Sequence, residues 1–294
     1  METILKEGLA QLGLDTGSIP ALTEFSRRLL EKNQVMNLTA ITEPADVARL
    51  HLLDCACLLT AADFRGKQVV DVGTGAGFPG MPLRLLEPDF DLTLLDSLGK
   101  RIDFLQETVD AMGLQRVRCV HARAEEFARQ HREQFDIAAS RAVAQLNVLC
   151  ELALPLVKVS GQFLAMKSVD TDDEIQRARS AIAQLGGRIG KIWDYTIPGT
   201  EVRHRVVIIR KERPTPAAYP RPFARIKKAP LGGVPNCIRG TWIWEKSLQW
   251  SPARAAPERP PSPPTWVWRW PPLGKIPCAW TATSPCGTWT WPWG

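Results

Sequence analysis

A glycine-rich segment that follows a short apolar run is the stretch whose residue types could best hold a ligand. Residues 71–80 read DVGTGAGFPG, with Gly73, Gly75 and Gly77 at alternate positions. Glycine accepts positive φ angles and lets the backbone approach a ligand closely, and the first N–H groups of a following helix would face that ligand. After the first strand of an open α/β sheet, such a segment predicts a site for a nucleotide-like cofactor.

The spacing of the glycines bears on the identity of that cofactor. The dinucleotide pattern Gly-x-Gly-x-x-Gly fails when it is read from Gly73, because Phe78 stands at the third glycine position. Read from Gly75, the pattern matches, but it begins late and contains a proline. Three glycines at alternate positions are instead the form seen in methyltransferases that use S-adenosylmethionine (SAM). A tight turn without any ligand is the simpler alternative.

An acidic residue after the next apolar run supports a cofactor with a ribose. Asp96 ends residues 91–96 and lies at roughly the distance downstream at which an acid meets ribose hydroxyls in such folds. A carboxylate can accept hydrogen bonds from both hydroxyls of a cis-diol, which NAD and SAM both offer. Asp96 could instead cap the helix that begins near Leu98. Because Ser97 could cap that helix equally well, we favour the ligand role.

Alternating strand and helix patterns surround these residues. We predict helices over 79–87, 99–112, 125–132, 146–157 (broken near Pro155) and 174–185, between strands over 67–72, 91–96, 117–121, 135–139 and 162–167. Two further strands, over 190–197 and 202–210, are close enough to form a hairpin. This order predicts an α/β fold with a mostly parallel, doubly wound sheet. By analogy, seven strands with an antiparallel last strand are the Rossmann-like class I methyltransferase arrangement.

The chain divides into four parts by pattern. Residues 1–60 are predicted to be a helical segment packed on the catalytic domain, which spans 61–213. Residues 214–231 form a basic strap, in which four cations gather around Phe223 and suit contact with RNA. A solvated strap without a ligand is the simpler alternative. Residues 232–294 hold ten of the eleven Trp and twelve of the 24 Pro. We interpret this segment as a disordered or non-native tail. A membrane-surface or peptide-binding segment is the alternative.

Charge and cysteine usage exclude several classes of protein. The net charge is +6, of which +4 lies in residues 232–294, so that any RNA contact of the nearly neutral remainder requires a local patch. The seven Cys show no paired metal spacing, and we expect no metal site and a reducing compartment. The N-terminus has no signal pattern, and no apolar run reaches membrane-spanning length. We therefore expect a soluble, cytoplasmic protein with no membrane partner.

Several short motifs, in order, resemble the RsmG (GidB) family of SAM-dependent methyltransferases of small-subunit ribosomal RNA. The resemblance covers about residues 21–231, and its most specific motifs are DSLGKR at 96–101 and SRAV at 140–143. The others are NLT at 37–39, HLLD at 51–54, the glycine segment, AEEF at 124–127 and YPR at 219–221. The Trp-rich tail has no counterpart in the family.

The resemblance implies methylation of N7 of one guanine in 16S ribosomal RNA. SAM would be the cofactor, 16S ribosomal RNA or the small subunit the partner, and we expect a monomer. The motifs and the resemblance together assign cofactor contacts to Gly73, Gly75, Gly77, Phe78, Asp96, Ser97, Leu98, Ala124, Glu125 and Arg141. RNA contacts are assigned to Arg221, Arg225, Lys227 and Lys228.

No general base is expected, because guanine N7 carries a lone pair at neutral pH. Positioning and electrostatics can supply most of the catalysis. We hypothesise that Asn37 and His51 hold the target near the methyl group. The simpler interpretations are that Asn37 is a turn residue, that His51 and Asp54 are a local surface pair, and that Arg141 makes a structural salt bridge at the sheet edge.

Two other classes of function remain open at the level of sequence. An NAD-dependent oxidoreductase could use the glycine frame that begins at Gly75, although the chain lacks an evident substrate domain. A non-catalytic RNA-binding protein could have kept the fold without the activity. The intact glycine segment and Asp96 argue against the second class.

Overall fold

The computed structural model describes residues 1–141 and 144–232. The predicted tail therefore lies outside the described residues from 233 on, as do Ala142 and Val143 of the SRAV motif. Within the described part, no helix is both long enough and apolar enough to cross a membrane.

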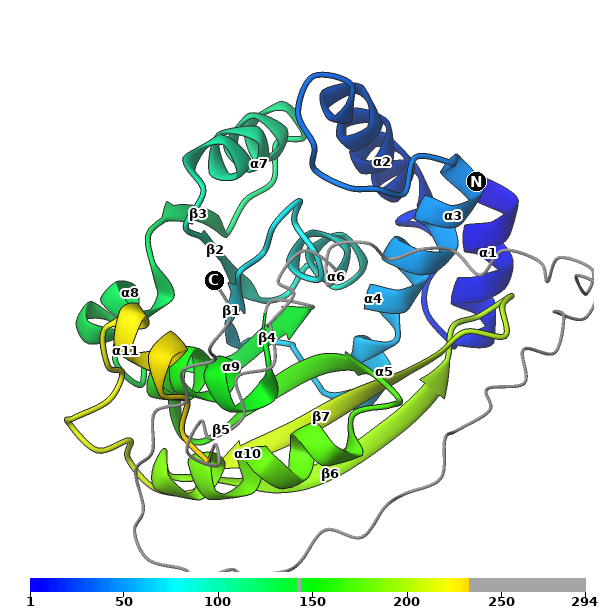
Figure 1. The fold of residues 1–294 in the computed structure, drawn as a ribbon. Helices are drawn as coiled ribbons and strands as arrows, with labels where there is room; N and C mark the ends of the chain where they lie inside the picture. Colours follow the sequence, from blue (N-terminus) through cyan, green and yellow to red (C-terminus); the bar gives the residue numbers. More distant parts are fainter. Residues whose placement is uncertain (142–143, 233–294) are drawn as a thin grey trace, which may run out of the picture. The chain divides into compact units, whose positions relative to one another are not determined.

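A seven-stranded sheet forms the centre of the described chain (Figure 1). Its strand order is β3-β2-β1-β4-β5-β7-β6, and β1 to β5 are mutually parallel. The bounds of the strands are β1 (Gln68–Val72), β2 (Asp91–Asp96), β3 (Val117–His121), β4 (Phe135–Arg141), β5 (Val157–Ser168), β6 (Gly187–Thr196) and β7 (Arg203–Lys211). The class I methyltransferase arrangement predicted from the sequence is confirmed.

Strand β7 is antiparallel to both of its neighbours, β5 and β6. The connection from β6 to β7 is a short hairpin, and a parallel crossover would need a much longer segment. The predicted hairpin is therefore confirmed. Strand β5 is longer than predicted, because a 3-10 turn at Leu154–Leu156, which contains Pro155, ends the preceding helix and the extended chain begins directly at Val157.

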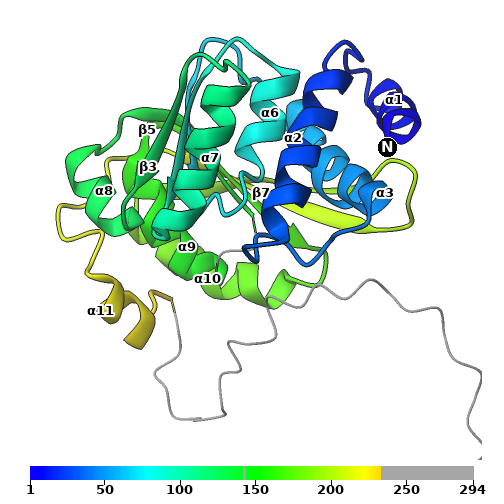
Figure 2. The ribbon, with the colours of Figure 1, turned by 90° about the horizontal axis from the view of Figure 1, so that it is seen from above.

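Helices cover both faces of the sheet (Figures 1 and 2). Alternate residues of β1 belong to different cores, since Val69 packs with one hydrophobic cluster while Val70 and Val72 pack with the other. The first cluster includes α6 (Gly80–Leu86) and α7 (Gly99–Ala111). The second includes α8 (Ala124–Gln130), α9 (Leu146–Ala153) and α10 (Asp172–Gln184). The sheet is thus the middle layer of three.

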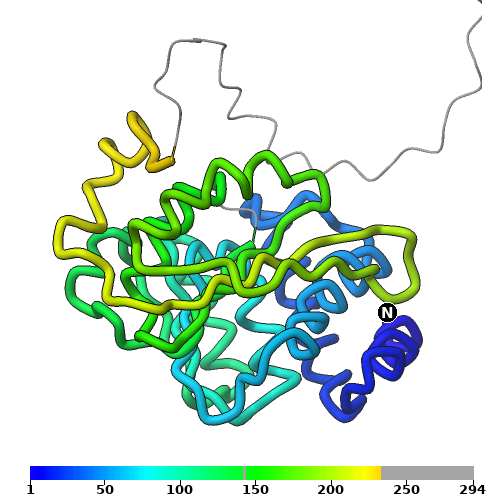
Figure 3. Tube along the Cα trace, turned by 90° about the horizontal axis from the view of Figure 1, so that it is seen from below, coloured from blue at the N-terminus to red at the C-terminus, as the bar shows by residue number. Residues whose placement is uncertain are grey.

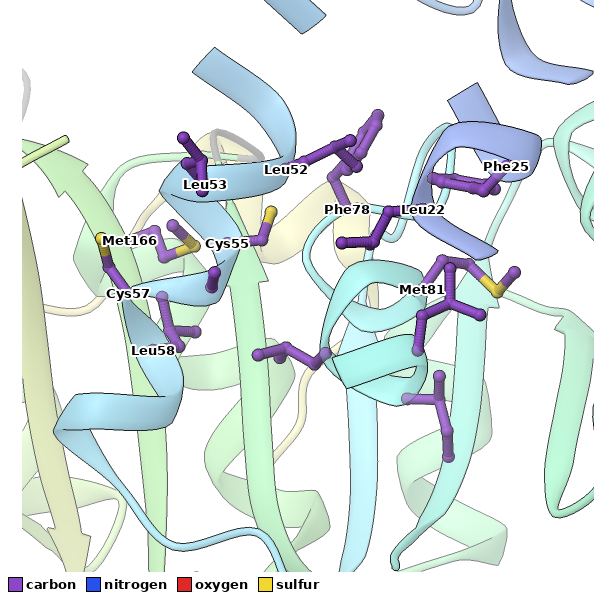
Figure 4. Close-up of a cluster of buried hydrophobic side chains, with 14 of the residues drawn as sticks. Leu22, Phe25, Leu52, Leu53, Cys55, Cys57, Leu58, Phe78, Met81 and Met166 are labelled. Atoms are coloured by element: carbon purple, nitrogen blue, oxygen red, sulfur yellow. The ribbon is translucent and has the colours of Figure 1, made fainter. Parts of the chain in front are cut away.

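The N-terminal helices extend the first of these cores. They are α1 (Glu2–Gln11), α2 (Ile19–Asn33), α3 (Pro44–Val47), the π-helical turn η1 (Ala48–Leu53), α4 (Asp54–Ala56) and α5 (Leu58–Ala61). Figure 4 shows side chains of α2 and η1, among them Phe25 and Leu52, beside Phe78 and Met81. Because this packing joins the N-terminal segment to the glycine segment, residues before 60 reach the predicted cofactor site.

The strap after β7 is tied to the domain by hydrogen bonds to its backbone. Arg132 donates hydrogen bonds to the backbone carbonyls of Thr215, Pro216 and Tyr219. The strap ends in α11 (Phe223–Lys228), which Figure 3 shows in yellow. Because these three carbonyls lie within residues 215–219, one arginine fixes the path by which α11 reaches the domain.

Candidate functional site

The carboxyl ends of the parallel strands open into a pocket of about 780 Å³. Residues that end or follow successive strands line it, and along the sheet from β3 to β5 they are Glu125, Asp96, Gly73, Arg141 and Ser168. Neighbouring strands lie about 4.8 Å apart, so this row extends over roughly 20 Å. A pocket of this volume holds a ligand of nucleotide size or larger.

The three predicted glycines of the segment do not play the same part. Gly73 and Gly75 line the pocket, and a Cβ built on Gly75 (φ +61°) would meet no atom within 4 Å. Gly77 (φ +99°) is not among the lining residues, and a Cβ there would lie 2.8 Å from Met81 and 2.9 Å from Leu105. Gly77 therefore permits close packing of the loop, whereas Gly75 leaves room for a ligand.

Asp71, to which the sequence analysis gave no role, holds this loop by hydrogen bonds. Its Oδ2 accepts hydrogen bonds from the Thr74 hydroxyl at 2.7 Å and from the Gly80 N–H at 2.8 Å. Burial raises the pKa of the Asp71 carboxyl to about 6, although both hydrogen bonds act in the opposite direction. A carboxylate inside an otherwise apolar strand, just before the glycines, was the signal that could have identified it.

Asp96 makes two backbone hydrogen bonds beside the pocket, and its ligand role stays a prediction. Its Oδ2 accepts the N–H of Gly75 at 2.9 Å, and its Oδ1 accepts the N–H of Leu98 at 2.9 Å, where α7 begins. Ser97 makes no side-chain cap, since the N-cap of α7 is Leu98 and lacks one. A carboxylate offers about four acceptor positions, so Asp96 can still accept hydrogen bonds from the pocket that it lines. Ser97 and Leu98 also line the pocket, and the Leu98 side chain is 52% exposed.

The end of the pocket beside β3 is built from three segments. Ala124 and Glu125, two of the predicted cofactor contacts, line it, and the buried Glu125 accepts a hydrogen bond from Arg123 Nε at 2.7 Å. The Arg123 guanidinium also lies over the Phe223 ring, 4.6 Å from its centre. Phe223 therefore forms a wall of this end of the pocket, a role that the sequence analysis did not assign to the strap.

Arg141 ends β4 in the middle of the sheet and joins several pocket residues. Its Nη1 lies 3.1 Å from Asp54 Oδ2 and its Nη2 lies 3.1 Å from His51 Nδ1. The guanidinium is also 4.7 Å from the centre of the Phe78 ring. The structural salt bridge weighed in the sequence analysis thus exists, but its placement at a sheet edge was wrong, because β4 lies between β1 and β5.

Asp54 is only 1% exposed and accepts three hydrogen bonds. Besides Arg141, the Tyr195 hydroxyl and His204 Nδ1 each lie 2.7 Å from its Oδ1. Burial alone would raise the pKa of the Asp54 carboxyl, but His204 and Arg141 together hold this pKa below its ordinary value. The interpretation of His51 and Asp54 as a surface pair is therefore wrong. Tyr195 and His204 were missed; the structure places them directly opposite each other in the β6–β7 ladder.

His51 lies between the glycine segment and the loop before α3. Its ring stacks on Phe78 at 4.5 Å, and its Nε2 is 2.8 Å from the Thr39 hydroxyl. Burial and the neighbouring charge of Arg141 lower the pKa of His51 to about 3, so the imidazole is neutral at physiological pH. His51 and Thr39 line the pocket, whereas Asn37 is exposed and not among the lining residues. The predicted role of Asn37 stays a prediction.

The four predicted RNA-binding cations fall into two groups. Arg221 makes a bidentate ion pair with the buried Glu151, at 2.7 Å to Oε1 and 2.6 Å to Oε2. Arg225, Lys227 and Lys228 lie on α11 with exposed side chains. Arg221 therefore anchors the strap, and the exposed side of α11 carries the other three cations.

The pocket therefore combines a backbone loop, a carboxylate and a buried arginine network along one row. In residues 1–141 and 144–232, no group of three or more His, Cys, Asp or Glu is arranged to hold a metal ion. Such a site can bind an adenosine-type ligand at the β2 and β3 ends and place a second reactant beyond Arg141. It can promote a group transfer by orientation and charge.

Comparison with known proteins gives consistent matches over this part of the chain. The family model described as "rRNA small subunit methyltransferase G" (GidB) matches residues 18–194. A relative of that name from Clostridium perfringens is 46% identical over 206 residues, which cover 69% of this chain and 86% of the relative. One from Alkaliphilus metalliredigens is 44% identical over 233 residues, covering 78% of this chain and 98% of the relative. A third, from Symbiobacterium thermophilum, is 44% identical over 238 residues.

Proposed function

The chain belongs to the GidB family of ribosomal RNA small subunit methyltransferases, and on this premise we propose that it methylates N7 of a specific guanine in 16S ribosomal RNA. SAM is the methyl donor. The observation that carries the proposal is the row of ligand-binding groups from Glu125 past Asp96 and Gly73 to Arg141. Family membership gives no support to an NAD-dependent oxidoreductase or to a non-catalytic RNA-binding protein.

The residues present fit SAM along this row. Asp96 has acceptor positions left for the two ribose hydroxyls, and Ala124 and Glu125 lie one strand further on, where the adenine would be placed. Gly75 leaves open space at the start of the loop, on the side where the methionine part would lie. When bound, SAM supplies a methyl group whose bond to sulfur breaks, with the electron pair remaining on sulfur, as the N7 lone pair forms the new bond.

The target base would then lie at the β4–β5 end of the pocket. Arg141, Ser168 and His204 line that end, and they come from β4, β5 and β7. The positive charge moves from sulfur to the base during transfer, and no proton has to be removed from N7. These residues therefore act by orienting the base and excluding water, which is the contribution that positioning can make.

The exposed cations of α11 support contact with the ribosomal RNA. Arg225, Lys227 and Lys228 lie next to Phe223, which is itself a wall of the pocket. Cations of this kind contact phosphates without reading sequence. We further propose that the protein works as a monomer in the cytoplasm, with residues 1–60 and 214–231 as extensions of the catalytic domain over 61–213.

Methyl transfer from isotope-labelled SAM tests the proposal. Purified protein is incubated with unmodified small-subunit RNA and with small-subunit particles, and labelled nucleosides are identified by mass spectrometry. We expect label in 7-methylguanosine in at least one of the two substrates. Label in another nucleoside would overturn the target, and no label in either substrate would overturn the activity.

A pair of variants relates this activity to the pocket. Asp96→Asn removes acceptor capacity from the ribose end and should raise the dissociation constant for SAM at least about tenfold. Asp103→Asn changes an exposed carboxyl on α7 and should leave SAM binding and transfer unchanged. Equal SAM affinity in the two variants would contradict the assignment of Asp96.

A further inference from the structure

The Thr39 side chain is held rigidly at the wall of the pocket. The Asn33 Oδ1 atom accepts the N–H groups of Leu38 at 2.8 Å and Thr39 at 2.9 Å, and Asn33 Nδ2 donates to the Thr39 carbonyl at 3.0 Å. One amide side chain thus fixes the backbone on both sides of Thr39. Thr39 is part of the pocket lining, beside His51, which in turn contacts Arg141.

Arg141 decides which nitrogen of His51 carries the proton. Its Nη2 lies 3.1 Å from His51 Nδ1, and a guanidinium can only donate hydrogen bonds. His51 Nδ1 must therefore accept, and the ring proton is on Nε2. The Leu50 carbonyl lies 3.2 Å from His51 Nδ1, but it accepts its hydrogen bond from Arg141 Nη1 at 3.3 Å.

This tautomer fixes the direction of the hydrogen bonds at the Thr39 hydroxyl. His51 Nε2–H donates to Thr39 Oγ1 at 2.8 Å, and the N–H of Ile41 donates to the same oxygen at 3.1 Å. A hydroxyl has two acceptor lone pairs and one proton, so both acceptor positions are filled. Within residues 1–141 and 144–232 the Thr39 hydroxyl has no other hydrogen bond. Its proton can therefore only be donated, and Thr39 is one of the residues that line the pocket.

We infer that the Thr39 hydroxyl donates a hydrogen bond to O6 of the target guanine, and that this bond orients N7 and selects guanine over adenine. The inference rests on the proposed function. Guanine presents N7 and O6 as adjacent acceptors on one edge, whereas adenine presents N7 beside an N6–H₂ donor. An adenine in the same pose would set a donor against a hydroxyl that cannot accept. Arg141 and His51 are positioning residues in this scheme, because they act through Thr39.

The test compares bases that keep or lack O6. The substrate is small-subunit RNA in which the nucleotide identified by the labelling experiment is guanine, inosine or 2-aminopurine. Inosine keeps O6 and N7, whereas 2-aminopurine keeps N7 and lacks O6. The wild-type protein should prefer guanine and inosine over 2-aminopurine by about tenfold in kcat/KM or more. In Thr39→Val, which replaces the hydroxyl by a methyl group, this preference should fall to about onefold.

Matched variants separate this role from a structural one. Thr39→Ser keeps the hydroxyl and should keep the preference. Thr39→Ala should repeat the result of Thr39→Val and serves as a second variant if valine packs poorly. Thr42→Val changes an exposed threonine outside the pocket lining and is the control. SAM affinity should be unchanged in all four variants. If Thr39→Val and Thr39→Ala keep the wild-type preference against 2-aminopurine, the inference is overturned while the methyltransferase activity stands. If the wild-type protein labels no guanine at all, the proposed function itself is what fails.

Discussion

Replacing Asp54 by asparagine should destabilise the fold far more than replacing an exposed aspartate. Asp54 is buried, and Arg141, Tyr195 and His204 all bind its two carboxylate oxygens. An asparagine whose oxygen stays with Tyr195 and His204 turns its NH₂ group toward Arg141 Nη1. The guanidinium then loses its counter-charge and faces another donor. Breaking a buried ion pair in this way costs about 3–5 kcal/mol.

The loss translates into a measurable shift of the unfolding transition. For a domain of this size, each kcal/mol changes Tm by about 2–4 °C, so Asp54→Asn should lower Tm by about 6–20 °C at neutral pH. Urea denaturation would give the free energy of unfolding directly, from a change in midpoint at constant slope. The exposed Asp103→Asn is the control, with an expected change within about 0.5 kcal/mol.

The dependence of this loss on pH is a second readout. The folded-state pKa of Asp54 lies below its ordinary value, so the carboxylate contributes stability above the ordinary carboxyl pKa, and this contribution is lost as the pH falls through the folded-state pKa. The wild-type protein and Asp54→Asn should therefore converge in stability at acid pH. Combining Asp54→Asn with Arg141→Met removes both charges and should cost less than the sum of the single changes. A loss below about 1 kcal/mol for Asp54→Asn, equal to that of Asp103→Asn, would refute the reasoning.

Three further predictions follow from the loop and the strap. Gly77→Ala should lower the free energy of unfolding by about 1–3 kcal/mol because its Cβ meets packed side chains. Gly75→Ala should cost about 1–2 kcal/mol of backbone strain and should weaken SAM binding more than Gly77→Ala does. Urea denaturation measures the stability and calorimetric titration the SAM affinity, and weaker SAM binding by Gly77→Ala than by Gly75→Ala would contradict the prediction. Folding raises the pKa of Asp71. The stability of the wild-type protein relative to Asp71→Asn should therefore fall by up to about 3 kcal/mol as the pH rises from about 4 to above about 6. A difference in the free energy of unfolding that does not change with pH would contradict this pKa. Arg225→Gln with Lys228→Gln should weaken RNA binding and reduce the slope of log affinity against log salt by about 1.5, with SAM affinity unchanged; an unaltered slope in filter binding would remove α11 from the RNA contact.

Much of the fold could be predicted from the sequence because its signals are local. Strand β2 and strand β3 begin and end at the predicted residues, although only β2 is a buried apolar run and β3 is a half-exposed edge strand. The antiparallel β7 followed from the short connection that precedes it. The extent of β5 was underestimated, because Ser160 and Gly161 interrupt the apolar pattern before Gln162.

The sequence by itself therefore determined the strand–helix order, the glycine loop and the acid after β2, since each depends on residue type and spacing within one short segment. Only the tertiary structure decided which of these groups act together. Thr39, His51, Arg141 and His204 lie in four separate parts of the chain, and their hydrogen bonds depend on how the N-terminal helices and the β6–β7 hairpin pack on the sheet. The hydrogen bond from Gly75 to Asp96 and the ion pair of Arg221 with Glu151 were settled in the same way, because these partners lie far apart in sequence and are brought together by folding.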